Sequence, residues 1–145
     1  MSINAFEKEY PYISDVLIDT ADVKYNNLET SEYALWDTGA TRTCNSHEVA
    51  KASNLIPIGK IDMLGSSGIF TSNTYLVNIL LPNNIPVTDI LVQEADIGAA
   101  GIGLLIGMDI ITSGDFSVSN YNGKTAFTFR TPSQRKIDYV SDPYS

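Results

Sequence analysis

The chain has 145 residues, a length that allows one domain with a hydrophobic core but not two comfortable lobes. Hydrophobic residues make up 43% of the sequence and charged residues 18%, a balance typical of a globular protein rather than a disordered one. The net charge of −8 argues against nucleic acid and anionic membranes as partners, because both attract basic surfaces.

The sequence also favours a soluble protein in a reducing compartment. Cys44 is the only cysteine, so no disulfide can form within the chain. Residues 1–12 carry Glu7, Lys8 and Glu9 and lack the apolar segment of a signal peptide. No apolar run approaches the roughly 18 residues that span a membrane. We therefore expect a cytoplasmic protein.

The hydrophobic pattern predicts an all-β domain with one or two short helices. Residues 13–23 alternate in part and residues 32–36 return as a strand, so together they predict a hairpin. Asn45 or Ser46 can cap a short helix over residues 47–53. The remaining strands are expected, in chain order, at residues 58–64, 69–81, 85–93, 104–106, 116–119 and 125–129.

The most informative stretch is the apolar run Ala34-Leu35-Trp36 followed by Asp37-Thr38-Gly39-Ala40. An apolar run that ends at a glycine turn is typical of a buried strand that stops abruptly. The turn presents a carboxylate on Asp37, a short hydroxyl on Thr38 and, at Gly39, a backbone that another chain can approach closely. These are the parts of an aspartic-protease active-site loop.

Peptide hydrolysis of this kind needs two neighbouring carboxylates that share one proton, one to activate water and the other to protonate the scissile carbonyl. The chain contains a single Asp-Thr-Gly: Asp19-Thr20-Ala21 lacks the glycine, and Asp96-Ile97-Gly98 lacks the hydroxyl. An aspartic mechanism therefore requires Asp37 from each of two copies to meet on a two-fold axis, as in the isologous interface of a homodimer.

The order of the motifs resembles that of the retropepsin family, the single-domain, dimeric aspartic proteases, and of their bacterial relatives. The matching segments are the active-site motif at 35–40, the glycine-rich flap at 63–70, the apolar segment behind the active loop at 104–110 and the closing strands at 114–129. The resemblance covers a domain at residues 13–131. It leaves an N-terminal extension at 1–12 and a C-terminal tail at 132–145.

The resemblance implies an all-β, retropepsin-like half-barrel that is closed by homodimerisation and hydrolyses extended peptide or protein substrates. Asp37 would be the catalytic carboxylate, supported within its loop by Thr38, Gly39 and Ala40. The flap that would close over the peptide consists of Leu64, Gly65, Ser66, Ser67, Gly68 and Ile69. The residues that would pack behind the active loop are Leu105, Ile106, Gly107 and Asp109. We expect no cofactor and no metal.

Each of these residues also has a plainer interpretation. Asp37 can be an ordinary turn aspartate, and the loop at 65–68 an ordinary hairpin turn. Asp109 fits the N-cap of a short helix better than a second catalytic carboxylate. Cys44 and His47 lie three residues apart without a third partner, so neither a Cys-His nucleophile nor a metal site is expected. The alternative function is a catalytically silent module of the same fold that dimerises or binds peptides.

Overall fold

The computed structural model describes residues 4–65 and 67–144, and these form a mostly-β protein, as the sequence predicts. The strands are β1 (Asn4–Glu9), β2 (Ile18–Tyr25), β3 (Leu28–Trp36), β4 (Cys44–Asn45), β5 (Gly59–Gly65), β6 (Gly68–Leu81), β7 (Ile85–Glu94), β8 (Ile102–Ile106), β9 (Asp115–Ser119) and β10 (Ala126–Thr131). The helices are α1 (His47–Ala52) and α2 (Met108–Ile111), with short 3₁₀ turns at Pro82–Asn84, Gly98–Ala100 and Tyr121–Gly123. No helix in the two described ranges is long and apolar enough to cross a membrane.

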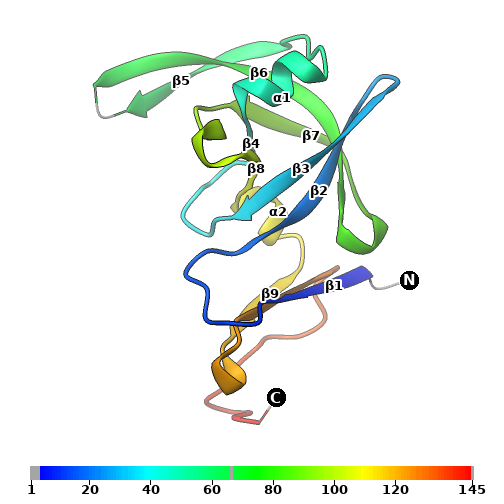
Figure 1. Ribbon diagram of the computed structural model, residues 1–145, viewed down its shortest axis with the longest axis vertical. Helices are drawn as coiled ribbons and strands as arrows, with labels where there is room; N and C mark the ends of the chain where they lie inside the picture. Colours follow the sequence, from blue (N-terminus) through cyan, green and yellow to red (C-terminus); the bar gives the residue numbers. More distant parts are fainter. Residues whose placement is uncertain (1–3, 66, 145) are drawn as a thin grey trace.

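Within those ranges, seven strands form one sheet in the order β2-β3-β8-β4-β7-β6-β5, and β2 also pairs with β6. This additional pairing joins residues 22–24 to residues 78–80 and closes six strands into a barrel-like ring. In the described part of the chain, β5 pairs only with β6 and stays outside the ring. Figure 1 shows the β5–β6 hairpin extending away from the rest of the molecule. The ring closes within one chain, whereas closure by a second copy stays a prediction.

The parallel pair β3 and β8 forms the wall of the ring that leads to the Asp-Thr-Gly turn. Ala34 lies opposite Leu104 and Trp36 opposite Ile106. All four side chains are buried, since residues two apart on a strand point to the same face. Because the two strands run in the same direction, both end at the same edge, and the segments that follow them leave the ring side by side.

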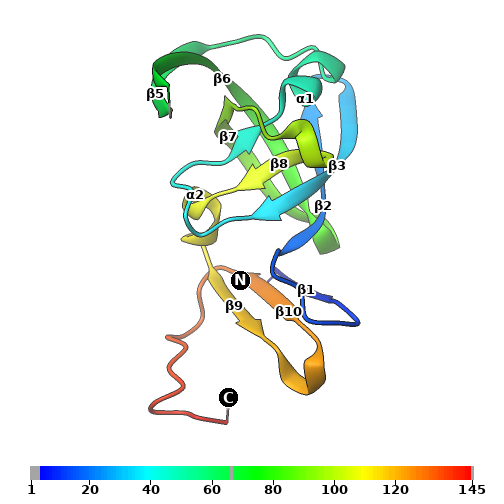
Figure 2. The same ribbon diagram turned by 60° about the vertical axis from the view of Figure 1, so that its left-hand side comes forward.

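A second, three-stranded sheet in the order β1-β10-β9 lies beneath the ring (Figure 2). An aromatic cluster joins the two sheets. The Trp36 ring is stacked on Phe116 with 5.6 Å between centroids, and Phe6, Phe127 and Phe129 pack around it at 5.2–6.0 Å. Aromatic side chains bury large areas, so this cluster provides a substantial apolar contact between the sheets.

The strand predicted to begin at residue 13 begins instead at Ile18. Residues 13–17 bend because the side chains around them bind their backbone: the Ser14 N–H donates to Thr125 Oγ1 at 2.8 Å, and the Ile18 N–H donates to the Tyr10 hydroxyl at 2.6 Å. The sequence alternation does not reveal this bend, because the residues that bind it come from other parts of the chain.

The predicted N-terminal extension contains β1, which pairs with β10 along its whole length. Its Phe6 side chain is 4% exposed and belongs to the core. The sequence pattern places residues 1–12 outside the domain. The few apolar residues of β1 form too weak a pattern to predict a strand whose partner is the last one in the chain.

We predict that Phe127→Ala lowers the free energy of unfolding by about 3–5 kcal/mol, because it removes a fully buried ring from the junction of the two sheets. Urea unfolding followed by tryptophan fluorescence measures this change, since Trp36 is in the same cluster. Tyr121→Ala is the matched control, because that side chain is 80% exposed on the β9–β10 connection. Equal losses for the two variants would contradict the assignment of Phe127 to the junction.

Candidate active site

Asp37 is the first residue after β3. Its N–H donates to the Ile106 carbonyl at the end of β8, with 2.9 Å between nitrogen and oxygen. The Trp36 side chain before it is buried, whereas Asp37 is partly exposed. The carboxylate is therefore placed at the point where a stiff, parallel strand pair reaches the surface.

The loop that follows binds the Asp37 carboxylate from one side. The Gly39 N–H donates to Asp37 Oδ1 at 2.8 Å, and a Cβ at position 39 would lie 3.1 Å from the same oxygen. The Ala40 N–H donates to the Asp37 carbonyl at 3.2 Å, and the Ala40 carbonyl accepts from the Met108 N–H at 2.8 Å. Main-chain groups therefore set the direction of the carboxylate.

A cleft of about 360 Å³ lies beside the carboxylate and is lined by Asp37 and Thr38. Its other walls come from the end of β3, from the bend at 15–17 and from β9. Val16 and Val118 give the cleft a partly exposed apolar rim. The Asp37 Oδ2 atom accepts no hydrogen bond from the described residues, so it is open to a water or to a second carboxyl group.

Behind the loop, the segment after β8 approaches it very closely. A Cβ at Gly107 would lie 2.7 Å from the main-chain carbon and oxygen of Arg42, so only glycine fits there. The Gly107 N–H donates to Thr43 Oγ1 at 3.2 Å. Asp109 completes the anchor, because its two carboxylate oxygens accept from the Thr43 hydroxyl at 2.8 Å and from the Thr43 N–H at 2.9 Å.

The interpretation of Asp109 as a helix N-cap is wrong. Gly107 occupies the N-cap position of α2 and provides no side-chain bond, while Asp109 lies in the first turn and reaches across to Thr43. An aspartate at a helix start fits a cap when only its neighbours are considered, but its actual partner lies 66 residues away. Thr43, which belongs to none of the sequence motifs, is fully buried. Its only sequence signal is a hydroxyl shortly after Asp-Thr-Gly.

The predicted flap residues form the end of the β5–β6 hairpin. Leu64 pairs with Ile69 and Gly65 with Gly68, and Gly68 has a φ of +118° that favours glycine. Leu64 is 85% exposed and Ile69 is 74% exposed, so the hairpin presents apolar side chains that nothing in the described chain covers. Ser67 is an exposed turn residue, and Ser66 lies outside the described residues.

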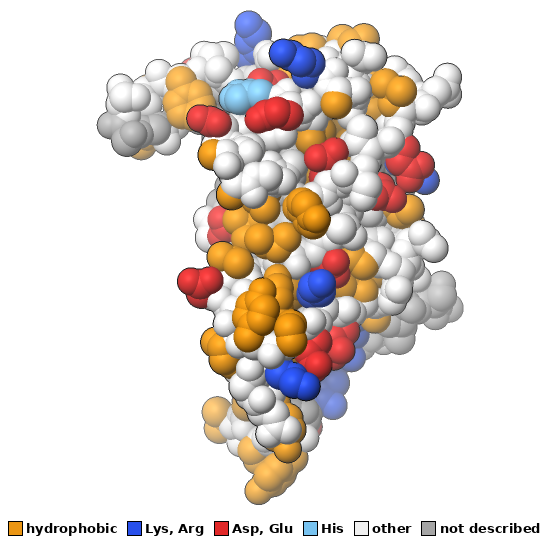
Figure 3. Space-filling view, in the orientation of Figure 1, with side chains coloured by type: hydrophobic (Ala, Val, Ile, Leu, Met, Phe, Trp, Pro, Cys, Tyr) orange, Lys and Arg blue, Asp and Glu red, His pale blue; other side chains and the backbone are white. Residues whose placement is uncertain are grey.

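Cys44 donates its thiol hydrogen to the Arg42 carbonyl, with 3.6 Å between sulfur and oxygen. Burial raises the pKa of the Cys44 thiol, and the charges of Asp109 and Asp37 raise it further, so this thiol is a poor nucleophile. His47, the only histidine, binds Glu94 instead and lies among acidic side chains in Figure 3. Among the described residues, no group of three or more His, Cys, Asp or Glu side chains could hold a metal ion.

A larger cavity, about 570 Å³, lies between β10 and the C-terminal tail, away from Asp37. Its charged centre is Asp115, which accepts from the Gln134 N–H at 2.8 Å, the Ser133 hydroxyl at 2.5 Å and Arg130 Nε at 2.7 Å. These bonds hold the pKa of Asp115 well below its usual range. Asp115 therefore ties the tail to β9, and the arrangement is structural.

The chain is similar to solved protein structures but to no known sequence family. No protein-family model and no curated protein sequence matches it. Among solved structures, it is similar to a retropepsin-like aspartic protease from Rickettsia conorii, with a TM-score of 0.54 and 14% sequence identity over 90% of this chain and 95% of that one. It is also similar to the protease of simian foamy virus (mac), with a TM-score of 0.48 and 20% identity over 66% of this chain and 91% of that one. A Legionella pneumophila protein of unknown function gives a TM-score of 0.42 and 20% identity over 65% and 82% of the two chains.

At 14% identity, the similarity to the Rickettsia structure establishes the fold alone. The similarity extends over nearly the full length of both chains. This chain has a retropepsin-like fold, which confirms the fold class expected from the sequence. The roles of Asp37 and of the residues around it are not decided by this likeness.

We predict that Gly107→Ala lowers the free energy of unfolding by about 1–3 kcal/mol, because a methyl group there collides with main-chain atoms of Arg42 that cannot rotate away. Urea unfolding measures the loss. The backbone amides of residues 37–43 should also exchange their hydrogens faster than in the wild type. Gly59→Ala is the control, since the nearest atom to a Cβ there is the Thr74 hydroxyl at 3.1 Å. A Gly107→Ala protein as stable as the control would show that the close approach is not required.

Proposed function

We propose that the chain is a homodimeric aspartic endopeptidase that hydrolyses extended peptide or protein substrates. The observation that carries the proposal is the position of Asp37. Its carboxylate is held on one side by the Gly39 N–H and open on the other, at the edge of a retropepsin-like ring. The similarity to a retropepsin-like aspartic protease from Rickettsia supports it.

In the proposed dimer, the Asp37 carboxyl groups of the two copies lie together and share one proton, since two like charges at that distance cannot both ionise. The ionised carboxylate takes a proton from water while the water oxygen bonds to the scissile carbonyl carbon. The protonated carboxyl gives its proton to the carbonyl oxygen. Proton transfer to the amide nitrogen then breaks the carbon–nitrogen bond and releases the two peptides.

The residues around Asp37 have positioning roles in this proposal. Thr38, exposed at the cleft, braces the two loops across the two-fold axis, and Gly39 brings its backbone close to water and substrate. Ala40 is held by Met108, so the loop keeps its shape. The residues that hold the loop from behind are Leu105, Ile106, Gly107 and Asp109.

The β5–β6 hairpin is the flap of this proposal. Its exposed Leu64 and Ile69 side chains would contact the side chains of a bound peptide, and its strand edges would add main-chain hydrogen bonds to an extended substrate. Closure over the peptide excludes water from the reacting bond.

We predict that Asp37→Asn reduces peptide cleavage by about a thousandfold or more, because an amide cannot activate water in a shared-proton pair. Mass spectrometry of a peptide library incubated at mildly acidic pH measures the loss, and urea unfolding checks that the fold survives. Asp19→Asn, which changes the other Asp-Thr pair, is the matched control and should keep full activity. Wild-type protein that binds peptides without cleaving them would contradict the proposal and favour the silent module.

We also predict that the active species is a dimer of the 15.8 kDa chain, because each copy supplies only one Asp-Thr-Gly carboxylate. Sedimentation equilibrium at the concentrations used for the cleavage assay measures its mass. Specific activity should fall on dilution below the dissociation constant of the dimer. Undiminished activity from a protein that sediments only as a monomer would overturn the two-copy mechanism.

A further inference from the structure

The β5–β6 hairpin leaves the ring at a defined point. β6 is one continuous strand whose second half pairs with β7 and whose first half pairs only with β5. The last pair between β6 and β7 joins Thr74 to Gln93. The hairpin therefore joins the ring at Thr74, which we call the pivot, and Glu94 is the first residue of β7 beyond that pair.

Glu94 binds this pivot in two ways. Its main-chain carbonyl accepts from the Ser72 hydroxyl, on the hairpin side of the pivot. Its carboxylate accepts from the Tyr75 hydroxyl, on the ring side. The Asn73 side-chain amide also donates to the Tyr75 hydroxyl at 3.4 Å. Both sides of the pivot are therefore bound to one residue.

The other carboxylate oxygen of Glu94 contacts His47 Nδ1, from the first residue of α1. This end of α1 is fixed to the ring, because the Ser46 hydroxyl caps the helix and the Ser46 N–H donates to the Gly103 carbonyl at 2.9 Å. Glu94 thus links a fixed helix to the strand that carries the hairpin. The Tyr75 side chain is only 3% exposed, so its hydroxyl is a second fixed point.

Charged groups from three elements surround His47. Glu94 comes from β7, Asp96 from the segment after it and Glu48 from α1 itself. Lys60 of β5 lines the same cleft of about 470 Å³ as His47, Glu94 and Asp96. Three carboxylates act on His47 against Lys60 in this cleft, and their negative charge favours the protonated imidazole.

We propose that Glu94, Tyr75 and His47 form a latch that fixes the angle of the β5–β6 hairpin on the ring, and that protonation of His47 tightens this latch. The three are positioning residues, because they act on the hairpin rather than on the reacting bond. The consequence for substrate closure rests on the proposed function, whereas the latch itself does not.

The pKa values of His47 and Glu94 set the pH range over which the latch is charged on both sides. The Glu94 hydrogen bond, and then the charges of Glu94, Asp96 and Glu48, outweigh desolvation and raise the pKa of His47 above its ordinary 6.5. Burial acts to raise the pKa of Glu94, but bonds from Tyr75 and His47 hold it below its ordinary 4.5. Both partners are therefore mostly charged between about pH 4.5 and 6.5. It weakens as the pH rises through the raised pKa of His47.

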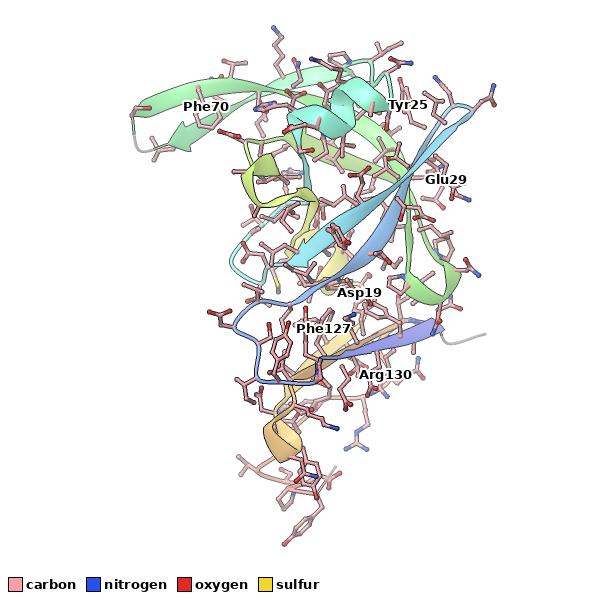
Figure 4. All side chains as sticks on the ribbon, viewed as in Figure 1. Asp19, Tyr25, Glu29, Phe70, Phe127 and Arg130 are labelled. Carbon is pink, nitrogen blue, oxygen red and sulfur yellow. The ribbon has the colours of Figure 1, made fainter. Side chains whose placement is uncertain are left out.

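The first test uses the single histidine of the chain. NMR titration of the His47 imidazole should give a pKa above 6.5 in the wild type and a lower one in Glu94→Gln, which keeps an oxygen for Tyr75 but removes the charge. Glu29→Gln is the matched control, since it removes a carboxylate from an exposed pair with Lys24 on the β2–β3 hairpin (Figure 4). An imidazole that titrates identically in wild type and Glu94→Gln would overturn the pairing.

The second test measures the hairpin. Hydrogen-exchange protection of residues 59–64 and 68–73, corrected for intrinsic rates, should fall roughly two- to fivefold between pH 5.5 and 8 in the wild type. In His47→Gln it should be low and independent of pH over this range. Tyr75→Phe, which removes only a hydroxyl, should lower protection at both pH values without unfolding the ring.

The latch proposal is contradicted if the corrected hydrogen-exchange protection of the wild-type hairpin does not change with pH. It is also contradicted if this protection matches that of His47→Gln at every pH. Neither measurement uses peptide cleavage, so a latch that responds in a protein without peptidase activity would contradict the proposed function alone. In a protein that cleaves peptides, we expect His47→Gln to raise KM more than it lowers kcat, because the hairpin then closes less readily over the substrate.

Discussion

The parallel pairing of β3 with β8 is the constraint on which the candidate site depends. The two strands end together, so the Asp37 N–H meets the Ile106 carbonyl at 2.9 Å and the following segments pass each other in close contact. The space between them is so narrow that position 107 has no room for a side chain. Main-chain bonds of a strand pair hold a group more firmly than a loop alone could, and the proposed role of Asp37 needs that precision.

Trp36 connects this constraint to the second sheet. It precedes Asp37. Its indole side chain packs between the barrel-like ring of strands and the side chains of Phe116, Phe127 and Phe129 in β9 and β10. It is accommodated because β1, β9 and β10 provide an aromatic surface for it. The first and last strands of the chain therefore support the loop from below.

What the sequence could predict is what lies close together along the chain. The Asp-Thr-Gly turn after an apolar strand, the glycine-flanked hairpin and the Ser46 cap of α1 each involve a few consecutive residues, and their patterns are visible. The bonds from Asp109 to Thr43 and from Glu94 to His47 span 66 and 47 residues, and they leave no periodic trace. Polar contacts between distant segments decide the details of the site, so these details appear only in the folded chain.

The ring of strands closes through β2 and β6 inside one chain, and its apolar core is buried without a partner. In the proposed dimer, a second copy would therefore contribute chemistry rather than a missing part of the core. Folding and activity would then depend on different interactions. The fold depends on the core and the aromatic junction, whereas the proposed activity depends on association that brings a second carboxylate to Asp37 Oδ2. The β5–β6 hairpin depends on a third set of contacts. Among the described residues, it pairs with the ring only through β6, and polar contacts hold it at Glu94. A site that cleaves an extended peptide must open for the peptide and then exclude water from it. Such a site needs a rigid carboxylate, and it needs a hairpin whose position a few polar bonds can adjust.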